Sequence, residues 1–282
     1  MRRDPGAAVT AELDWIGTRV LERLAPGDAR AATERYRRAL YRGRRVHCPV
    51  CDGRFRFFKP AWNRPDAICP ACMSQERHRA LALFLRARPG LLDAVGSLLH
   101  FAPEPGLARL VRDAGVPRYV SADLRSPEAM DHVDIQELPY ESGSFDAIIC
   151  SHVLEHVPDD RQAMRELLRV LRPGGWALVM VPVDPGRSST LQDPSVATAQ
   201  ERRATYRQED HLRLYGRDVP ERLDAEGFST DVVRFVRGLD ESDRLRHGLN
   251  PEDEFYFARR TLHGAEGREA AGPDRCPSAS GR

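Results

Sequence analysis

The chain has 282 residues, of which 41% are apolar and 30% charged, and its formal net charge is +1. These proportions are typical of a globular protein that can hold one medium α/β domain and a smaller module. No apolar run reaches the roughly 18 residues of a spanning helix, which excludes a helical membrane protein and gives no reason to expect a membrane partner. The N-terminal residues also lack the apolar core of a secretory signal, so we expect a cytoplasmic protein.

The charge is unevenly distributed along the chain. Between Arg30 and Gly90 there are fifteen Arg or Lys residues and four acidic residues, about +11, which leaves about −10 for the rest. A basic module beside an acidic domain has two explanations: it binds nucleic acid, or it docks onto its acidic neighbour. The composition leaves both explanations open.

Two helices are expected in an N-terminal helical segment over residues 1–45. The apolar residues that recur at intervals of three to four are Leu13, Ile16, Val20 and Leu24. Pro26 and Gly27 then break the pattern, and a second helix is expected from about residue 29 to residue 41.

Four cysteines form two CxxC pairs, Cys48-Pro-Val-Cys51 and Cys69-Pro-Ala-Cys72, which are separated by 17 residues. Each pair can present two thiolates to one tetrahedral ion, and this spacing is typical of a zinc site. Disulfides are the alternative, but they fit poorly with a chain that shows no secretory signal. Four sulfur ligands leave no open position, so we expect a structural zinc ion that stabilises a module over residues 46–90.

Aromatic and basic residues alternate between the two cysteine pairs. The aromatic residues are Phe55, Phe57, Phe58 and Trp62. Such rings can stack on the bases of a nucleic acid, but in so small a module we expect them to form the core. The other two cysteines have no part in the zinc site, since Cys150 ends an apolar strand and Cys276 lies near the C-terminus.

From residue 91 onward, short apolar strands alternate with helices, which predicts a parallel sheet with crossover helices over residues 91–261. The expected strands are Ser97–Phe101, Tyr119–Ala122, Phe145–Cys150, Trp176–Pro182, Asp231–Val236 and Glu254–Arg259. The expected helices are Arg77–Arg88, Asp159–Leu171 and Arg217–Ala225. Residues 262–282 are polar and rich in Gly and Pro, so we expect a disordered tail.

The turn after the first of these strands contains two prolines. In Ala102-Pro-Glu-Pro-Gly106 a single glycine remains where nucleotide-binding folds have several. Loops that bind phosphate need free backbone N–H groups, and proline has none. The turn therefore argues against NAD and is compatible with a cofactor that lacks phosphate.

Two neighbouring motifs resemble one enzyme family. Residues 144–157 read SFDAIICSHVLEHV, and residues 168–175 read LRVLRPGG. At this spacing they resemble the class I S-adenosylmethionine-dependent methyltransferases, close to the methyltransferase type 11 group, and the resemblance covers roughly residues 95–261. It implies a Rossmann-like sheet, S-adenosylmethionine as cofactor, and methyl transfer to an O- or N-nucleophile of a small molecule or peptide. The alternative is a zinc-ribbon nucleic-acid-binding protein, or an RNA methyltransferase, that uses the basic module.

The resemblance also implies which residues contact the nucleoside part of the cofactor. Asp123, at the end of the second strand, would accept hydrogen bonds from the ribose hydroxyls. Asp134 would accept from the exocyclic amine of adenine, and Ile135 would pack on the ring.

The turn itself departs from the family, which usually has an acidic residue and then a glycine-rich loop, whereas this chain has His100 and two prolines. We expect Ala102 and Gly106 to permit close backbone approach and Glu104 to face the cationic methionine end. His152, just after the third expected strand, is the remaining candidate for cofactor binding.

His156 and His211 are the candidate catalytic residues. His156 closes the HVLEH motif at the sheet edge where ligands of open α/β folds bind. His211 lies in an insertion over residues 186–216, where relatives have substrate-facing residues, and the intrinsic pKa of histidine suits a general base. The alternative for His211 is a solvated loop held by contacts between histidine and aspartate.

Overall fold

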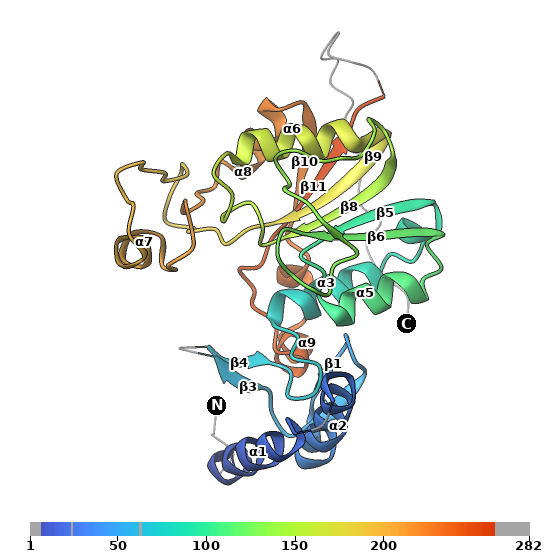
Figure 1. The fold of residues 1–282 in the computed structure, drawn as a ribbon, viewed down its shortest axis with the longest axis vertical. Coiled ribbons are helices and arrows are strands. Elements are labelled where there is room, and N and C mark those ends of the chain that lie inside the picture. The colour runs from blue at the N-terminus through green and yellow to red at the C-terminus, as the bar shows by residue number, and fades with distance from the viewer. Residues whose placement is uncertain (1–6, 24, 62–63, 263–282) are drawn as a thin grey trace.

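A computed structural model describes residues 7–23, 25–61 and 64–262 (Figure 1). A large sheet lies between helices, and a smaller module that contains the N-terminal helices lies below it in this view. No helix in the described part of the chain is long and apolar enough to cross a bilayer. Trp62, Cys276 and the expected tail beyond Leu262 lie outside the described residues.

The large sheet has seven strands in the order β10-β11-β9-β8-β5-β6-β7. They are β5 (Ser97–Phe101), β6 (Arg118–Asp123), β7 (Asp131–His132), β8 (Phe145–Ser151), β9 (Leu171–Met180), β10 (Phe228–Val233) and β11 (Phe255–Arg260). Strands β5 to β9 pair in parallel, and β11 is antiparallel to both β9 and β10. The expected Rossmann-like α/β sheet with crossover helices is confirmed.

Helices cover both faces of this sheet (Figure 1). On one face lie α3 (Glu76–Arg86) and α5 (Pro105–Asp113), and on the other α6 (Asp160–Val170) and α8 (Val219–Ala225). Short helices occur at α4 (Gly90–Asp93), α7 (Ala199–Tyr206), η1 (Val236–Gly238) and α9 (Glu241–His247).

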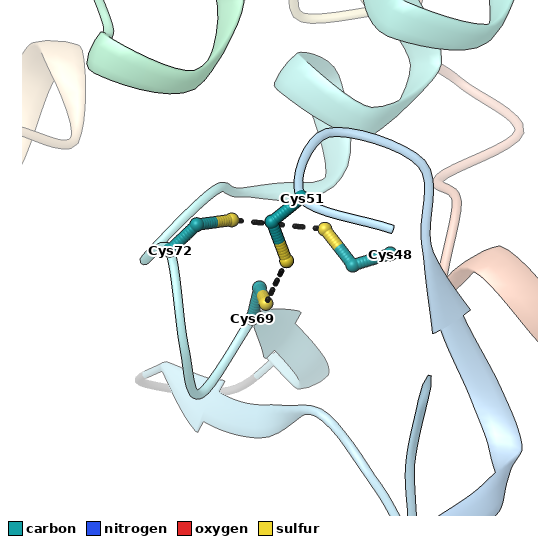
Figure 2. A group of neighbouring side chains, drawn as sticks. All are labelled: Cys48, Cys51, Cys69 and Cys72. Atoms are coloured by element: carbon teal, nitrogen blue, oxygen red, sulfur yellow. Dashed lines mark hydrogen bonds between the residues drawn. The ribbon is translucent and has the colours of Figure 1, made fainter. Parts of the chain in front are cut away.

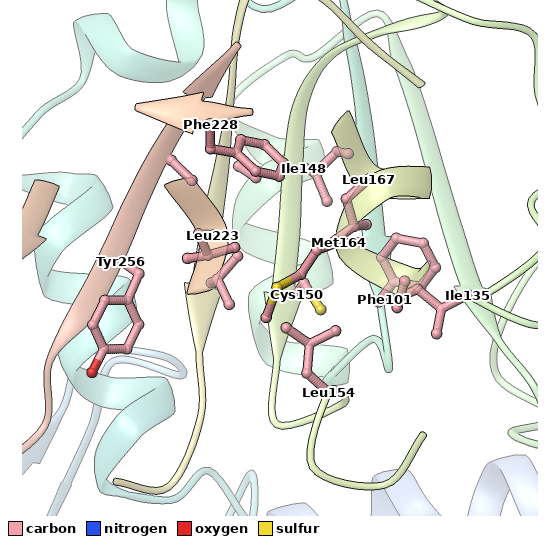
Figure 3. Close-up of a cluster of buried hydrophobic side chains, with 14 of the residues drawn as sticks. Phe101, Ile135, Ile148, Cys150, Leu154, Met164, Leu167, Leu223, Phe228 and Tyr256 are labelled. Atoms are coloured by element: carbon pink, nitrogen blue, oxygen red, sulfur yellow. The ribbon is translucent and has the colours of Figure 1, made fainter. Parts of the chain in front are cut away.

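Side chains of the central strands alternate between two apolar cores. In β8, Ile148 and Cys150 face the core under α6, whereas Ala147 and Ile149 face the core under α3 and α5. Figure 3 shows the first of these cores, in which Ile148 and Cys150 lie beside Met164 of α6. Both faces are covered, so the inner strands are apolar along their whole length.

Several element bounds differ from those expected. β10 begins at Phe228 rather than near Asp231, because Gly227, with φ of +103°, turns the chain directly from α8 into the strand. β9 begins at Leu171 rather than at Trp176, because residues 172–175 form an irregularity inside the strand. Short helices α7 and α9 were missed, since neither has a long apolar stripe.

The smaller module combines two helices with two short hairpins. Its helices are α1 (Ala7–Leu21) and α2 (Pro26–Leu40), and its strands are β1 (Arg42–Cys48), β2 (Gly53–Phe55), β3 (Lys59–Ala61) and β4 (Arg64–Ile68). The second helix begins at Pro26 rather than at residue 29, because proline fits the first turn of a helix. Phe55 and Phe58 are buried in the core of this module, as expected.

A buried arginine joins the module to the larger domain. The guanidinium of Arg79, on α3, donates to the carbonyls of Asp66, Ala67 and Ser74 in the module and to those of His247 and Gly248 at the end of α9. It is fully buried and also lies 4.0 Å from the ring centre of Phe58. Part of the basic charge of residues 30–90 therefore serves the internal packing of the protein.

Candidate active site

The four cysteines of the two CxxC pairs converge on one point (Figure 2). The Sγ atoms of Cys48 and Cys72 are 3.7 Å apart, and those of Cys51 and Cys69 are 3.8 Å apart. Sulfur atoms at about 2.3 Å from a tetrahedral zinc ion are about 3.8 Å from one another. All four thiols are free. These residues could therefore hold a zinc ion, and the distances do not fit disulfides.

The carboxyl ends of three parallel strands meet at one edge of the large sheet. Phe101 of β5 is in register with Ala122 of β6 and with Cys150 of β8. This register brings Ala102, Asp123 and His152 to the same edge, where ligands of open α/β sheets bind. Ala102 and His152 both have positive φ, +47° and +56°, which is uncommon for residues other than glycine and often marks a functional turn.

Glu104, in the turn after β5, is held by two histidines. Its carboxylate lies 3.0 Å from His78 Nε2, on α3, and 3.2 Å from His100 Nε2, on β5. His100 is itself 3.0 Å from the hydroxyl of Tyr119 through Nδ1. Burial raises the pKa of Glu104, but the two histidines lower it by more, so this pKa lies well below its usual range. Glu104 is thus a fixed anion, and the His78 contact was not foreseen from the sequence.

Gly106 lies where the module meets this turn. A Cβ atom at this position would be 2.2 Å from Cγ1 of Val50, which stands between the first two cysteines. The glycine therefore allows the cysteine module to pack directly against the start of α5. Glu104 and Gly106 also line a cavity of about 790 Å³ that is bounded by α2, by residues 71–74 of the module and by α5.

The residues expected to contact ribose and adenine are not brought together in a cavity. Asp123 Oδ1 accepts hydrogen bonds from the N–H groups of Arg125 and Ser126, both at 2.7 Å. Asp134 is exposed and bonds to the backbone and side chain of Gln136. Ile135 is only 4% exposed and belongs to the core shown in Figure 3, so it offers little surface to a ring.

Three histidines and one glutamate cluster after β8. Glu155 is fully buried, with His152 Nδ1 at 3.0 Å and His156 Nε2 at 4.0 Å from its Oε1. The rings of His156 and His211 meet edge to face at a centroid distance of 4.8 Å. Burial raises the pKa of Glu155, but His152 and His156 lower it by more, whereas burial lowers the pKa of His211. The cluster therefore combines a carboxylate with neutral imidazole at His211.

The insertion that carries His211 is fixed to the loop after β8. The N–H of Leu212 donates to the carbonyl of Glu155 at 2.8 Å. Arg213, which is fully buried, donates to the carbonyls of Leu154 and Pro158. His211 itself is 6% exposed, whereas residues 207–210 before it are exposed, and the aspartate of this segment, Asp210, contacts His156.

A cavity of about 400 Å³ opens beside this cluster. The residues that line it come from the histidine cluster, the ends of β9 and β11, the insertion and the cysteine module, and include His152, Val181, Gln208, His211, Arg64, Arg77 and Asp253. Buried polar atoms without a partner occur at Arg77 Nε, His211 Nδ1 and Asp253 Oδ2. Such atoms are rare in proteins, and a polar ligand in the cavity would satisfy them.

Comparison with protein families identifies the larger domain. The family model described as "Methyltransferase domain" matches residues 105–179. Residues 105–179 are therefore similar to the methyltransferase domain of this family. The matched segment begins at Pro105, so the first three residues of the turn with two prolines, Ala102 to Glu104, lie outside it.

Several methyltransferases are similar to this domain over a limited length. The methyltransferase GfsG of Streptomyces halstedii is 39% identical over 90 residues, which are 32% of this chain and 28% of that protein. The ubiquinone biosynthesis O-methyltransferase of Xanthomonas oryzae is 37% identical over 84 residues, which are 30% of this chain and 32% of that protein. The chain thus spans less than a third of the length of these relatives.

Solved methyltransferase structures are also similar to the chain. An S-adenosylmethionine-dependent methyltransferase from Mesorhizobium loti has 20% sequence identity and a TM-score of 0.46, and the similarity covers 64% of this chain and 98% of that one. An N-methyltransferase of Burkholderia thailandensis, solved with bound S-adenosylhomocysteine, has 17% identity and a TM-score of 0.42, covering 66% and 84%.

Two residues of the cavity beside the histidine cluster could not have been found from sequence patterns. Arg77 stands next to the cysteine module and Asp253 follows α9, yet both line the cavity beside the histidine cluster. Nothing in their local sequence distinguishes them from surface charges, because only the packing of the module against α9 brings them together.

Proposed function

We propose that the chain is an S-adenosylmethionine-dependent methyltransferase that acts on an O- or N-nucleophile of a small molecule or peptide. The observation that carries the proposal is the common edge of β5, β6 and β8, where Ala102, Asp123 and His152 meet within a methyltransferase domain. The names of the relatives include both O-methyltransferases and a C-methyltransferase, so they support methyl transfer without favouring one acceptor atom.

The residues at this edge fit the polar groups of such a cofactor. Asp123 uses Oδ1 for its backbone hydrogen bonds, which leaves Oδ2 for the ribose hydroxyls. The fixed anion Glu104 suits the cationic methionine end, and the positive φ of Ala102 lets the backbone approach closely. Asp134 would have to exchange its Gln136 contact for the adenine amine. Bound S-adenosylmethionine would supply an electrophilic methyl group on sulfonium sulfur.

The cavity beside the histidine cluster is the proposed site for the methyl acceptor. His211 lines it and has an Nδ1 without a partner, and its lowered pKa leaves the imidazole neutral at pH 7. When the acceptor oxygen or nitrogen gains the methyl group, it loses its proton, and His211 Nδ1 is placed to take that proton. His156 packs against His211 and holds its ring. The orphaned Arg77 and Asp253 atoms favour a polar acceptor.

Calorimetry with the full chain tests the cofactor assignment. S-adenosylmethionine or S-adenosylhomocysteine should bind, and NAD should not. Asp123→Ala should weaken binding by about 1–3 kcal/mol, roughly tenfold to a hundredfold, because charge-assisted hydrogen bonds are lost. Glu104→Gln should weaken it without unfolding the protein. Binding of NAD in place of the methyl donor would contradict the proposal.

His211→Ala tests the acceptor side separately. Donor affinity should stay close to that of the wild type, while turnover should fall by about 100-fold, the usual share of general base catalysis. Arg203→Ala, an exposed position on α7 of the same insertion, is the matched control and should keep its turnover. Undiminished turnover of the His211 variant would return this histidine to a structural role.

A second candidate function, nucleic-acid binding by the cysteine module, has one observation in its favour. Arg42, Arg44 and Arg54 are exposed around a shallow cavity of about 480 Å³ between the first hairpin and α2. Anisotropy titrations with RNA at two salt concentrations test it, since phosphate contacts weaken steeply with salt. If Arg42→Ala and Arg44→Ala leave any RNA binding unchanged, this face is not a nucleic-acid site.

A further inference from the structure

The cluster after β8 has the composition of a metal site. One ligand-type atom from each of Glu155, His156 and His211 lies within 4.8 Å of the others. We propose that these three residues form a second metal site, distinct from the cysteines, that binds a divalent transition ion such as Zn²⁺. Two imidazoles and one carboxylate are a ligand set that zinc adopts in sites with an open position.

Two of the three residues have buried atoms without partners. Glu155 is fully buried and its Oε2 makes no hydrogen bond, while His211 is 6% exposed and its Nδ1 makes none. Buried polar atoms are nearly always paired, so an orphaned carboxylate oxygen and an orphaned imidazole nitrogen in one cluster indicate a missing partner. A cation satisfies both kinds of atom, since each offers a lone pair.

The third residue is oriented as metal-binding histidines are. His156 Nδ1 lies 3.3 Å from the carboxylate of Asp210, which directs its Nε2 toward Glu155 at 4.0 Å. A carboxylate on the far nitrogen fixes the tautomer and ring of a metal-binding histidine. His152 plays a similar part for Glu155, because its Nδ1 contacts Oε1 and leaves Oε2 unengaged.

The backbone around the cluster is already held in place. The hydrogen bond from Leu212 to Glu155 and the donations of Arg213 to Leu154 and Pro158 tie the two loops together. A small inward movement of side chains is enough to bring ligand atoms now up to 4.8 Å apart to metal-binding distance. The site therefore needs no rearrangement of the chain.

Three protein ligands leave one coordination position of the ion open. A molecule bound in the neighbouring cavity can occupy this position, since His211 lines that cavity. The role of the ion in activating the methyl acceptor rests on the proposed methyltransferase function, whereas the binding of the ion does not. The position would suit an acceptor with a hydroxyl group, because a bound divalent ion would lower the pKa of that hydroxyl, which would release its proton to solvent and become the nucleophile. If a metal were bound, Glu155, His156 and His211 would be its ligands, and the ion would activate the acceptor, a task that falls to His211 Nδ1 when no metal is bound.

Metal titration of the full chain tests the site directly. Protein whose cysteines are loaded with zinc is dialysed against Zn²⁺ and the metal is counted by mass spectrometry. We expect two equivalents per chain in the wild type and one in Glu155→Gln and in His211→Ala. Arg203→Ala, on the exposed helix α7, should keep two. Adding Co²⁺ to the zinc-loaded chain should give weak visible bands without thiolate charge-transfer absorption.

One equivalent in the saturated wild type overturns the proposal, as do two equivalents in both variants. If the variants fail to fold, as judged by circular dichroism, the cobalt spectrum of the wild type decides without them. Donor binding is measured by calorimetry on the same samples. If the wild type binds two equivalents of metal but no S-adenosylmethionine, the proposed enzyme is rejected and the metal site stands. If it binds S-adenosylmethionine but only one equivalent of metal, only the metal site is rejected.

Discussion

The cysteine module and the methyltransferase domain are stabilised in different ways. Among the described residues, the core of the module contains seven buried side chains, and two of these are cysteines. The two cores of the large sheet contain twenty-three and twenty. Burial of one large apolar side chain contributes about 1.5–3 kcal/mol, so the domain can rely on its cores. The core of the module is too small to stabilise it alone, so the module depends on directed interactions at the cysteines and at Arg79.

Among the described residues, a fully buried arginine nevertheless serves each region. Arg79 connects the module with the segment after α9, and Arg213 connects the insertion with the loop after β8. In both cases the guanidinium donates to backbone carbonyls of a segment far from the arginine in the sequence. A rigid group with five donors can satisfy several carbonyls at once, which apolar packing cannot do.

The largest effect should come from the cysteines. Cys69→Ser should abolish zinc binding at the cysteines and unfold the module around them, because metal binding supplies most of the folding energy of such modules. Hydrogen exchange should show lost protection in the module and retained protection in β5, β8 and β9. Cys150→Ser, a buried thiol in the domain, is the control and should keep the metal. Full protection of the module in metal-free protein would remove the contrast between the regions.

A smaller effect is expected from the buried arginines. Arg79→Met and Arg213→Met should each cost about 2–4 kcal/mol of unfolding free energy, because several buried carbonyls lose their donors. The local consequences should differ in hydrogen exchange. Arg79→Met should expose residues 66–74 and 247–248, and Arg213→Met should expose residues 154–158 and 210–215. Equal and uniform loss of protection in both variants would mean that the two regions unfold as one unit.

The smallest effect concerns the boundary between the regions. Burial and the nearby Glu76 of the module raise the pKa of Asp253 to about 6. In the unfolded chain this pKa is about 3.9, so the folded protein binds more protons between these values. The favourable contribution of Asp253 is therefore complete below about pH 4 and is lost as the pH rises through 6.

Asp253→Asn should remove this pH dependence and stabilise the protein at pH 7 by about 1–3 kcal/mol. The amide oxygen can still accept the hydrogen bond that Asn250 donates to Oδ1. Urea unfolding at pH 4.5 and pH 7 measures the change, with the exposed Asp231→Asn as the control. An unchanged or reduced stability at pH 7 would show that Asp253 is ionised at no cost to folding.

Sequence patterns predicted the large sheet well because its signals are local. The strand Ser97–Phe101 has the expected bounds, and the helix expected over Asp159–Leu171 is α6, within one residue at each end. Apolar alternation and periodicity report burial directly, and a capping residue such as Asp159 marks a helix start through a bond only three residues long. The CxxC spacing was informative for the same reason, since each pair brings its two sulfurs together locally.

The site depended on contacts that no local pattern contains. The sequence alone determined an α/β domain, its methyltransferase motifs and a set of four cysteines. Only the tertiary structure decided that His78 of α3 holds Glu104 and that Val50 packs on Gly106. It alone brought His211 to Glu155 and His156. These pairs are 26 to 56 residues apart along the chain, and the physical reason is that such proximity depends on how whole elements pack, not on the propensities of the residues themselves.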